Sequence, residues 1–327
     1  VSGAFPPTRL PGGVVWKPSR EDLAGTLVED RYLLGDRIGD GAMGSVYRAE
    51  HVLLGATVAV KVLHSRFESG SAAEQRFLRE GQSAGRIDHP NVVRIFDVGR
   101  LPDGAPYIVM ELLEGQELSK LLAAERLTLA RVATLASQLL SGLARAHAER
   151  VVHRDIKPDN LFLTREDNAE LLKILDFSIA KDQGAAAMTC DGDVLGTAHY
   201  LAPEQAIGKP IDARVDLWSV GVVAYEMLTG RPPFEGDTFP ALMMKILGDM
   251  PAPPSASVTG VPPEIDAFFE RALAKEPAER FQDAASMRMA LADAFAHGNV
   301  PLETTDDLPI EIVTVVDRLD LDDTLLD

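Results

Sequence analysis

The chain has 327 residues, 46% of them hydrophobic, which is enough to bury a sizeable core in one large domain or two modest ones. Its formal net charge of −18 argues against general nucleic-acid binding, which needs a basic face. A single cysteine, Cys190, excludes a disulfide framework within the chain and fits a reducing cytoplasm, and the lack of an apolar run of about 18 residues predicts no membrane span.

The N-terminal third reads as an arm followed by β-structure. Residues 1–29 are rich in Pro and Gly and predict a flexible arm. Short β-rich runs then alternate with glycines, which predicts a meander of strands. Next comes one helix, weakened by Gly81 and Gly85. The predicted ranges are strands within Tyr32–Leu63, a helix over residues 72–86, and strands at Val92–Val98 and Tyr107–Glu111.

After Glu114-Gly115 the pattern becomes helical. A helix over Arg214–Thr229 is apolar around its whole circumference and must be buried on most sides. Residues 297–327 are acidic and predict a tail, with Ile310–Val316 as an isolated strand. The other predicted helices are Leu118–Ala124, Leu129–Arg150, Phe239–Leu247, Pro263–Ala274 and Asp283–Phe295, and a strand pair is predicted at Leu161–Thr164 and Leu171–Leu175.

This order predicts an α+β fold with two lobes. A small β-rich lobe over residues 30–110 leads through a hinge at 111–115 to a larger helical lobe over 116–296. Ligands commonly bind in clefts between such lobes.

The segment Gly39-Asp40-Gly41-Ala42-Met43-Gly44 has the pattern G-x-G-x-x-G. A P-loop would need Lys-Ser/Thr after its last glycine, but Ser45-Val46 follows here. A dinucleotide-binding fold would need a helix next, whereas residues 45–50 are short and precede a second strand. A strand–turn–strand is therefore favoured. It resembles the glycine-rich loop of the protein kinases, whose backbone N–H groups cover phosphates, and glycine permits that close approach because it lacks a Cβ.

The next strand contains Val58-Ala59-Val60-Lys61. Period-two alternation places Ala59 and Lys61 on one face, as an adenine-and-phosphate surface requires. The structural alternative is a strand lysine that reaches out to solvent.

A third motif carries catalytic chemistry. It is His153-Arg154-Asp155-Ile156-Lys157-Pro158-Asp159-Asn160, followed after a predicted hairpin by Asp176-Phe177. The hairpin brings Asn160 and Asp176 to one end, where their hard oxygens suit Mg²⁺. From residue 30 to 296 the chain resembles the protein kinases, most closely the eukaryotic-like (Hanks-type) serine/threonine kinases of bacteria.

The resemblance implies roles for these residues. Asp155 orients the substrate hydroxyl and takes its proton, and Lys157 neutralises charge on the γ-phosphate of ATP. Asn160 and Asp176 hold Mg²⁺. Lys61 contacts the α- and β-phosphates and is held by a glutamate, Glu80 or, as the fallback, Glu74. The implied ATP-binding set is Ile38, Gly39, Gly41, Gly44, Val46, Ala59, Lys61, Met110, Glu111, Leu113 and Phe162.

The resemblance also implies regulation and bracing. Thr189 is the candidate phosphosite, with Arg154 as its receptor. Thr197 resembles the threonine that contacts catalytic groups. The structural residues implied are Glu204 with its arginine partner Arg280, and Asp216, which braces the catalytic loop.

Two further matches and one departure complete the comparison with the family. Glu117 and Glu226 match positions that read basic residues of the substrate in some relatives, although surface or structural roles are equally open to them. Ser178 replaces the last glycine of the family's Asp-Phe-Gly motif, and we expect it to restrict flipping of this loop.

The predicted function is a serine/threonine protein kinase that uses ATP and Mg²⁺ on protein substrates, because Lys157 lies at the position typical of Ser/Thr rather than Tyr kinases. Ser178 favours a rival, a catalytically weak nucleotide-binding scaffold. A small-molecule kinase is disfavoured by the intact Ala202-Pro203-Glu204. We expect a cytoplasmic protein, and pairing of two copies through the small lobe stays open.

Overall fold

The computed structural model describes residues 23–41, 44–64, 70–166, 169–177, 196 and 198–297. Thr189, Thr197 and the predicted strand at 310–316 lie outside these residues, as does most of the predicted arm. The chain divides into two compact units. The first comprises its described residues up to Gly81 together with Ile95–Leu112, and the second comprises Gln82–Arg94 and the described residues from Leu113 onward.

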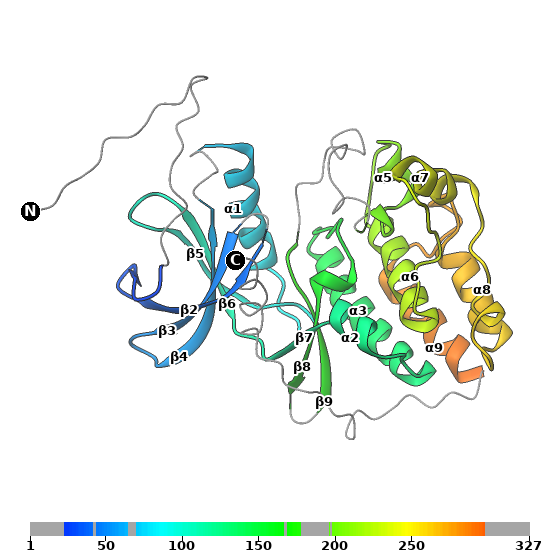
Figure 1. Ribbon diagram of the computed structural model, residues 1–327, viewed down its shortest axis with the longest axis horizontal. Helices are drawn as coiled ribbons and strands as arrows, with labels where there is room; N and C mark the ends of the chain where they lie inside the picture. Colours follow the sequence, from blue (N-terminus) through cyan, green and yellow to red (C-terminus); the bar gives the residue numbers. More distant parts are fainter. Residues whose placement is uncertain are drawn as a thin grey trace, which may run out of the picture. The chain divides into compact units, whose positions relative to one another are not determined.

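The first unit is built on a six-stranded antiparallel sheet, with strand order β1-β2-β3-β4-β6-β5 (Figure 1). Its strands are β1 (Leu27–Val28), β2 (Tyr32–Asp40), β3 (Gly44–His51), β4 (Ala56–Leu63), β5 (Ile95–Arg100) and β6 (Pro106–Glu111). The sequence assigned residues 27 and 28 to the arm, but they form β1 and pair with β2. Burial of Val28 in the core stabilises this pairing.

The two faces of this sheet bury different clusters. One face carries the larger core, which includes Val58, Val60 and Val62 of β4, as the alternation predicted. On the other face lie Leu63 and Ile108, which pack with Phe77 of helix α1 (Ala72–Ala84). Lys61 therefore stands on the face that α1 covers, because alternate residues of a strand share a face.

Gly81 explains how closely α1 packs on the sheet. A Cβ at this position would lie 2.8 Å from Val98 Cγ2 and 3.0 Å from Ile108 Cγ1. The predicted helix ran to residue 86, but α1 ends at Ala84, so Gly85 lies outside it. The sequence predicted that both glycines weaken the helix, whereas Gly81 serves packing.

The second unit is mainly helical and carries a small antiparallel sheet of order β7-β8-β9 (Figure 1). Its elements are β7 (Gly115–Glu117), α2 (Leu118–Ala124), α3 (Leu129–Ala148), the 3₁₀ turn η1 (Pro158–Asn160), β8 (Leu161–Glu166), β9 (Ala169–Ile174), α5 (Pro203–Ala206), α6 (Arg214–Thr229), α7 (Phe239–Gly248), the 3₁₀ turn η3 (Pro254–Ala256), α8 (Pro263–Ala272) and α9 (Ala284–His297).

Helix α6 is the centre of this unit. Thirteen of its residues are buried, from Val215 to Leu228, as its apolar circumference predicted. It ends at Gly230, whose φ of +73° is the left-handed conformation that favours glycine after a helix. Together the two units form the α+β fold predicted from the sequence. Over the described residues, every helix is too short or too polar to cross a bilayer.

Candidate active site

The glycine-rich segment joins β2 to β3. Gly41 N–H donates to Gly44 O at 3.0 Å, and Ser45 Oγ donates to Asp40 Oδ1 at 2.9 Å. Gly44 must be glycine, because a Cβ there would lie 2.3 Å from the Val62 carbonyl oxygen. At Gly39 and Gly41 an added Cβ would meet ordinary contacts of 3.7 Å, so packing does not demand glycine there. Both positions fit a loop that a phosphate approaches closely.

Lys61 lies in one cross-strand row of the first unit. Gly39 pairs with Val46, Val46 with Lys61, and Lys61 with Ile108. Directly opposed residues share a face, so the row aligns the start of the glycine segment with the lysine. Ala59, two residues before Lys61 on β4, pairs with Met110 of β6.

The two candidate carboxylate partners of Lys61 differ. Glu80 belongs to α1 by its backbone, and its side chain lies outside the described part of the chain. Glu74 is buried and forms an ion pair with Arg100, and its carboxylate also accepts a hydrogen bond from Gly70 N–H. These two contacts lower the pKa of Glu74. A glutamate already bound to Arg100 is a poor fallback for Lys61.

The other predicted adenine contacts lie in both units. Ile38 is in β2 and Glu111 is the last residue of β6, both in the first unit. Leu113 and Phe162 belong to the second unit, where Phe162 is buried in β8 opposite Glu117 of β7.

In the second unit, Asn160 closes the catalytic loop onto Asp155. Its Nδ2 donates to Asp155 O at 2.8 Å and to Asp155 Oδ2 at 3.3 Å. The preceding backbone forms η1, in which Asn160 N–H donates to Lys157 O at 3.0 Å. With Nδ2 directed at Asp155, the Oδ1 end of the amide faces the other way and is the end that could bind a metal.

Asp176 is brought beside Asn160 by strand pairing. Leu161 pairs with Ile174 in the β8–β9 hairpin, and Leu175 N–H donates to Asn160 O at 2.9 Å. Asp176 itself has a φ of +46°, a conformation costing a non-glycine residue on the order of 1–2 kcal/mol. The surrounding contacts hold it there, as is common at functional sites.

The donor set fits one hard metal ion held together with substrate oxygens. Within the described ranges, no three His, Cys, Asp or Glu side chains form a metal cluster of their own. Asn160 and Asp176 would supply two oxygen ligands, so that phosphates and water would complete the shell. Mg²⁺ typically binds in this way.

His153 joins the catalytic loop to the segment of Asp176. Its Nε2 lies 2.8 Å from Leu175 O, and Asp155 N–H lies 3.3 Å from its Nδ1. These partners are satisfied by a neutral imidazole with the proton on Nε2. The ring also packs against Phe177, with ring centroids 4.8 Å apart.

Asp216 of α6 braces the same loop. Its side chain is fully buried and accepts hydrogen bonds from His153 N–H at 2.9 Å and from Arg154 N–H at 2.7 Å. His147 Nε2 of α3 lies 2.8 Å from the same carboxylate. Arg154 has a φ of +66°, so the residue before Asp155 is also held in a left-handed conformation. The sequence predicted the brace but not His147.

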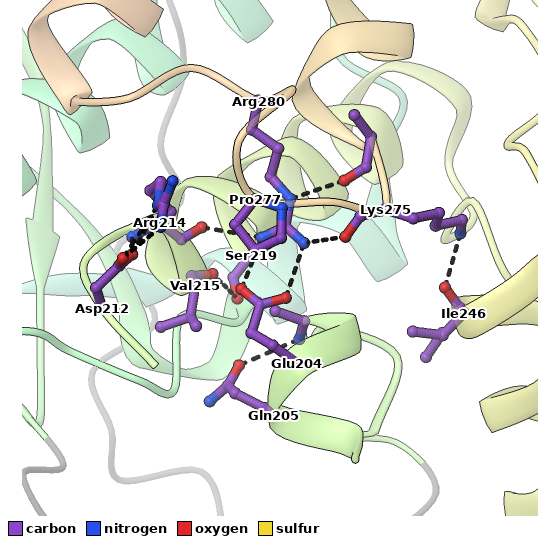
Figure 2. A network of polar contacts seen from close by, with 12 residues as sticks. Glu204, Gln205, Asp212, Arg214, Val215, Ser219, Ile246, Lys275, Pro277 and Arg280 are labelled. Atoms are coloured by element: carbon purple, nitrogen blue, oxygen red, sulfur yellow. Dashed lines mark hydrogen bonds and ion pairs between the residues drawn. The ribbon is translucent and has the colours of Figure 1, made fainter. Parts of the chain in front are cut away.

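Glu204 and Arg280 form a buried bidentate ion pair, with both N···O distances 2.8 Å (Figure 2). Arg280 also donates to the carbonyls of Ala274 and Lys275 at 2.7 and 2.8 Å. Its guanidinium stacks over the Trp218 ring. The arginine thus ties α5 to the segment between α8 and α9.

One face of α6 also holds the segment before α5. Ser219 Oγ donates to Tyr200 O at 2.8 Å, and Tyr200 OH donates to Glu226 Oε2 at 2.7 Å. Burial raises the pKa of Glu226, although the hydrogen bond from Tyr200 acts in the opposite direction. Asp216, Ser219 and Glu226 are polar residues at helical spacing within an apolar helix, a sequence pattern that marks one polar face of α6.

The comparisons with known proteins agree with this geometry. Residues 32–295 match the protein kinase domain family. The chain is 42% identical over 262 residues to the serine/threonine-protein kinase Pkn1 of Myxococcus xanthus, covering 80% of this chain and 38% of that protein. It is 40% identical over 271 residues to the serine/threonine-protein kinase PknB of Mycolicibacterium smegmatis, covering 81% and 43%.

Solved structures show the same fold. The PknI kinase domain of Mycobacterium tuberculosis superposes with a TM-score of 0.66 at 26% identity, covering 84% of this chain and 98% of that one. The described helices and strands, the tied catalytic loop and these matches lead to one conclusion. The chain belongs to the protein kinase family, among the Hanks-type serine/threonine kinases of bacteria.

Proposed function

We propose that this chain transfers the γ-phosphoryl group of Mg–ATP to serine and threonine hydroxyls of proteins. The chain spans 38% to 52% of the length of the first curated relatives, so the activity and substrates of the whole protein belong to this proposal. The observation that carries it is the hydrogen bonding of Asn160 to Asp155 on one side and to Leu175 on the other. These contacts support a site at which Asp155 acts as the base and Asn160 and Asp176 act as oxygen ligands.

In the proposed reaction, Asp155 orients the substrate hydroxyl and accepts its proton as the new oxygen–phosphorus bond forms. Lys157, two residues on, neutralises charge on the transferred group. Asn160 and Asp176 hold the metal, for which Mg²⁺ is the proposed ion. Bound by these two side chains, a metal would supply positive charge to offset the charge that develops on the phosphate oxygens.

The first unit acts on the same ATP molecule. Gly39 and Gly41 lack a Cβ and so let the phosphates come close to the backbone of this segment. Lys61 is the proposed contact of the α- and β-phosphates, held by Glu80. The row that aligns Gly39, Val46 and Lys61 supports this role. Ile38, Ala59, Met110, Glu111, Leu113 and Phe162 are the proposed adenine contacts.

The regulation of the protein and its cellular compartment are proposed from the sequence. We propose that Thr189 is phosphorylated in the activation segment and that Thr197 contacts the catalytic residues. The single cysteine supports a reducing cytoplasm as the working compartment. Mass spectrometry of the protein after incubation with Mg–ATP would show whether Thr189 carries phosphate.

Transfer of label from [γ-³²P]ATP to the protein itself and to Ser/Thr peptides tests the proposed function, with Asp155→Asn alongside. Removal of a general base costs about 10²–10⁴-fold in rate, so Asp155→Asn should lose the activity while keeping its fold and Mg–ATP binding. A wild-type protein that binds Mg–ATP without transferring phosphate would establish the scaffold rival. Transfer to small molecules alone would also contradict the proposal.

A further inference from the structure

Gln205 of α5 forms hydrogen bonds through both ends of its carboxamide, and the residue is only 9% exposed. Oε1 accepts a hydrogen bond from Ala202 N–H at 3.1 Å, and Nε2 donates to Arg154 O at 3.3 Å. Figure 2 shows Gln205 beside Glu204 on this short helix. The two partners fix the amide orientation, because a flipped amide would set N–H against N–H and C=O against C=O.

The Arg154 carbonyl belongs to the peptide plane that connects Arg154 to Asp155. The N–H of the same plane is that of Asp155, which lies 3.3 Å from His153 Nδ1. Gln205 and His153 therefore hold the two edges of one peptide plane. The preceding plane is held by Asp216 through Arg154 N–H at 2.7 Å.

These hydrogen bonds matter because Arg154 has a φ of +66°. A non-glycine residue leaves this conformation readily unless its backbone groups are held. If the Arg154 carbonyl lost the hydrogen bond from Gln205, the plane could rotate and carry the Cα of Asp155 with it. Small displacements of a reacting group cost a large factor in rate.

We propose that Gln205 is a positioning residue for catalysis, which fixes Asp155 by holding the peptide plane between Arg154 and Asp155. The inference rests on the proposed function, in which Asp155 is the base. It also connects the catalytic loop to α5, whose Glu204 is anchored by Arg280.

The alternative is that Gln205 serves only to cap α5, and Gln205→Glu separates the two roles. Glutamate at this helix position accepts from the Ala202 N–H as well as glutamine does. It cannot donate to Arg154 O unless protonated, and its anion is repelled by that carbonyl. Gln205→Ala removes both contacts. Gln82→Glu on the exposed part of α1 controls for the added charge.

The test measures kcat and the KM for ATP of these variants. We expect Gln205→Glu to lower kcat about tenfold at pH 8 (about 1.4 kcal/mol), with the KM for ATP unchanged. The ratio of its kcat to that of the wild type should rise toward pH 6, as protonation restores a donor. Gln82→Glu should match the wild type. If Gln205→Glu equals the wild type at every pH, the residue only caps α5 and the proposal is overturned.

Hydrogen exchange supplies a readout that needs no activity. Peptides covering residues 151–160 should exchange faster in Gln205→Glu than in the wild type, and unchanged exchange there would contradict the positioning role. If the wild type were inactive but residues 151–160 still exchanged faster in Gln205→Glu, the proposed function would be refuted. The role of Gln205 in fixing the loop would still stand. The two failures are thereby distinguished.

Discussion

At the residue scale, Asp216 shows how a buried charge is tolerated. A carboxylate removed from water is costly unless hydrogen bonds replace its hydration. Here the N–H groups of His153 and Arg154 and the ring of His147 surround the two oxygens. Two of these donors belong to the catalytic loop and one to α3. The hydrogen bonds that stabilise the buried carboxylate therefore also hold the loop in place.

Asp216→Asn should therefore destabilise the second unit by about 2 kcal/mol, because an amide N–H₂ would face a buried backbone N–H. Urea unfolding followed by the fluorescence of Trp218, with Trp16→Phe as background, measures this. The matched control is Asp266→Asn, where the carboxylate accepts from Ser255 at an exposed site and the loss should stay below about 1 kcal/mol. Equal losses at the two positions would argue against a special role for the buried carboxylate.

Residues of the family motifs could be identified from the sequence because their types and order are distinctive. Asp155, Asn160 and Asp176 are of this kind, and strand pairing brings Asn160 and Asp176 together as predicted. Gln205 and His147 could not be found in this way. Their partners are a backbone carbonyl and a carboxylate about 50 to 70 residues away, and a sequence pattern does not encode such a contact.

At the element scale, periodicity predicted α2 and α6 with their observed bounds, because both have strong apolar patterns. The strand predicted at 92–98 was partly wrong. Val92 forms a bridge with Ile174, and Val93 N–H donates to Ile174 O, whereas β5 starts at Ile95 and pairs with β6. A single β-rich run is thus divided between two pairings, which propensity alone cannot reveal.

Gly81→Ala tests whether α1 needs its close approach to the sheet. Alanine gains up to about 1 kcal/mol in helix propensity, but the new Cβ overlaps Val98 and Ile108, and such overpacking costs about 1–3 kcal/mol. We expect a net loss of stability in thermal unfolding and a raised KM for ATP, because α1 carries Glu80. Gly248→Ala is the control, since nothing lies within 4 Å of a Cβ there, and it should be neutral or stabilising. A stable Gly81→Ala enzyme with unchanged KM would refute this account.

At the scale of the whole molecule, the change from strands to helices along the chain predicted two units. It did not predict that residues 82–94 belong to the second one. Asn91 accounts for this, because its Nδ2 donates to Leu172 O at 2.9 Å and its carbonyl accepts from Ile174 N–H at 2.9 Å. These contacts span about 80 residues, so they follow from tertiary structure rather than from local sequence.

The proposed function requires residues of both units for one ligand, which gives a prediction for the stability of the whole chain. A ligand that binds the folded state stabilises it by about 2.7 kcal/mol at 100 times its Kd, or roughly 5 °C in Tm for a domain of this size. Mg–ATP should produce this shift in the wild type, and ATP with EDTA a smaller one. Lys61→Met in the first unit and Asp176→Asn in the second should each reduce the Tm shift produced by Mg–ATP. In Asp176→Asn, the remaining shift should be the same with Mg²⁺ as with EDTA. A full shift in either variant would show that its side chain does not bind the nucleotide–metal complex.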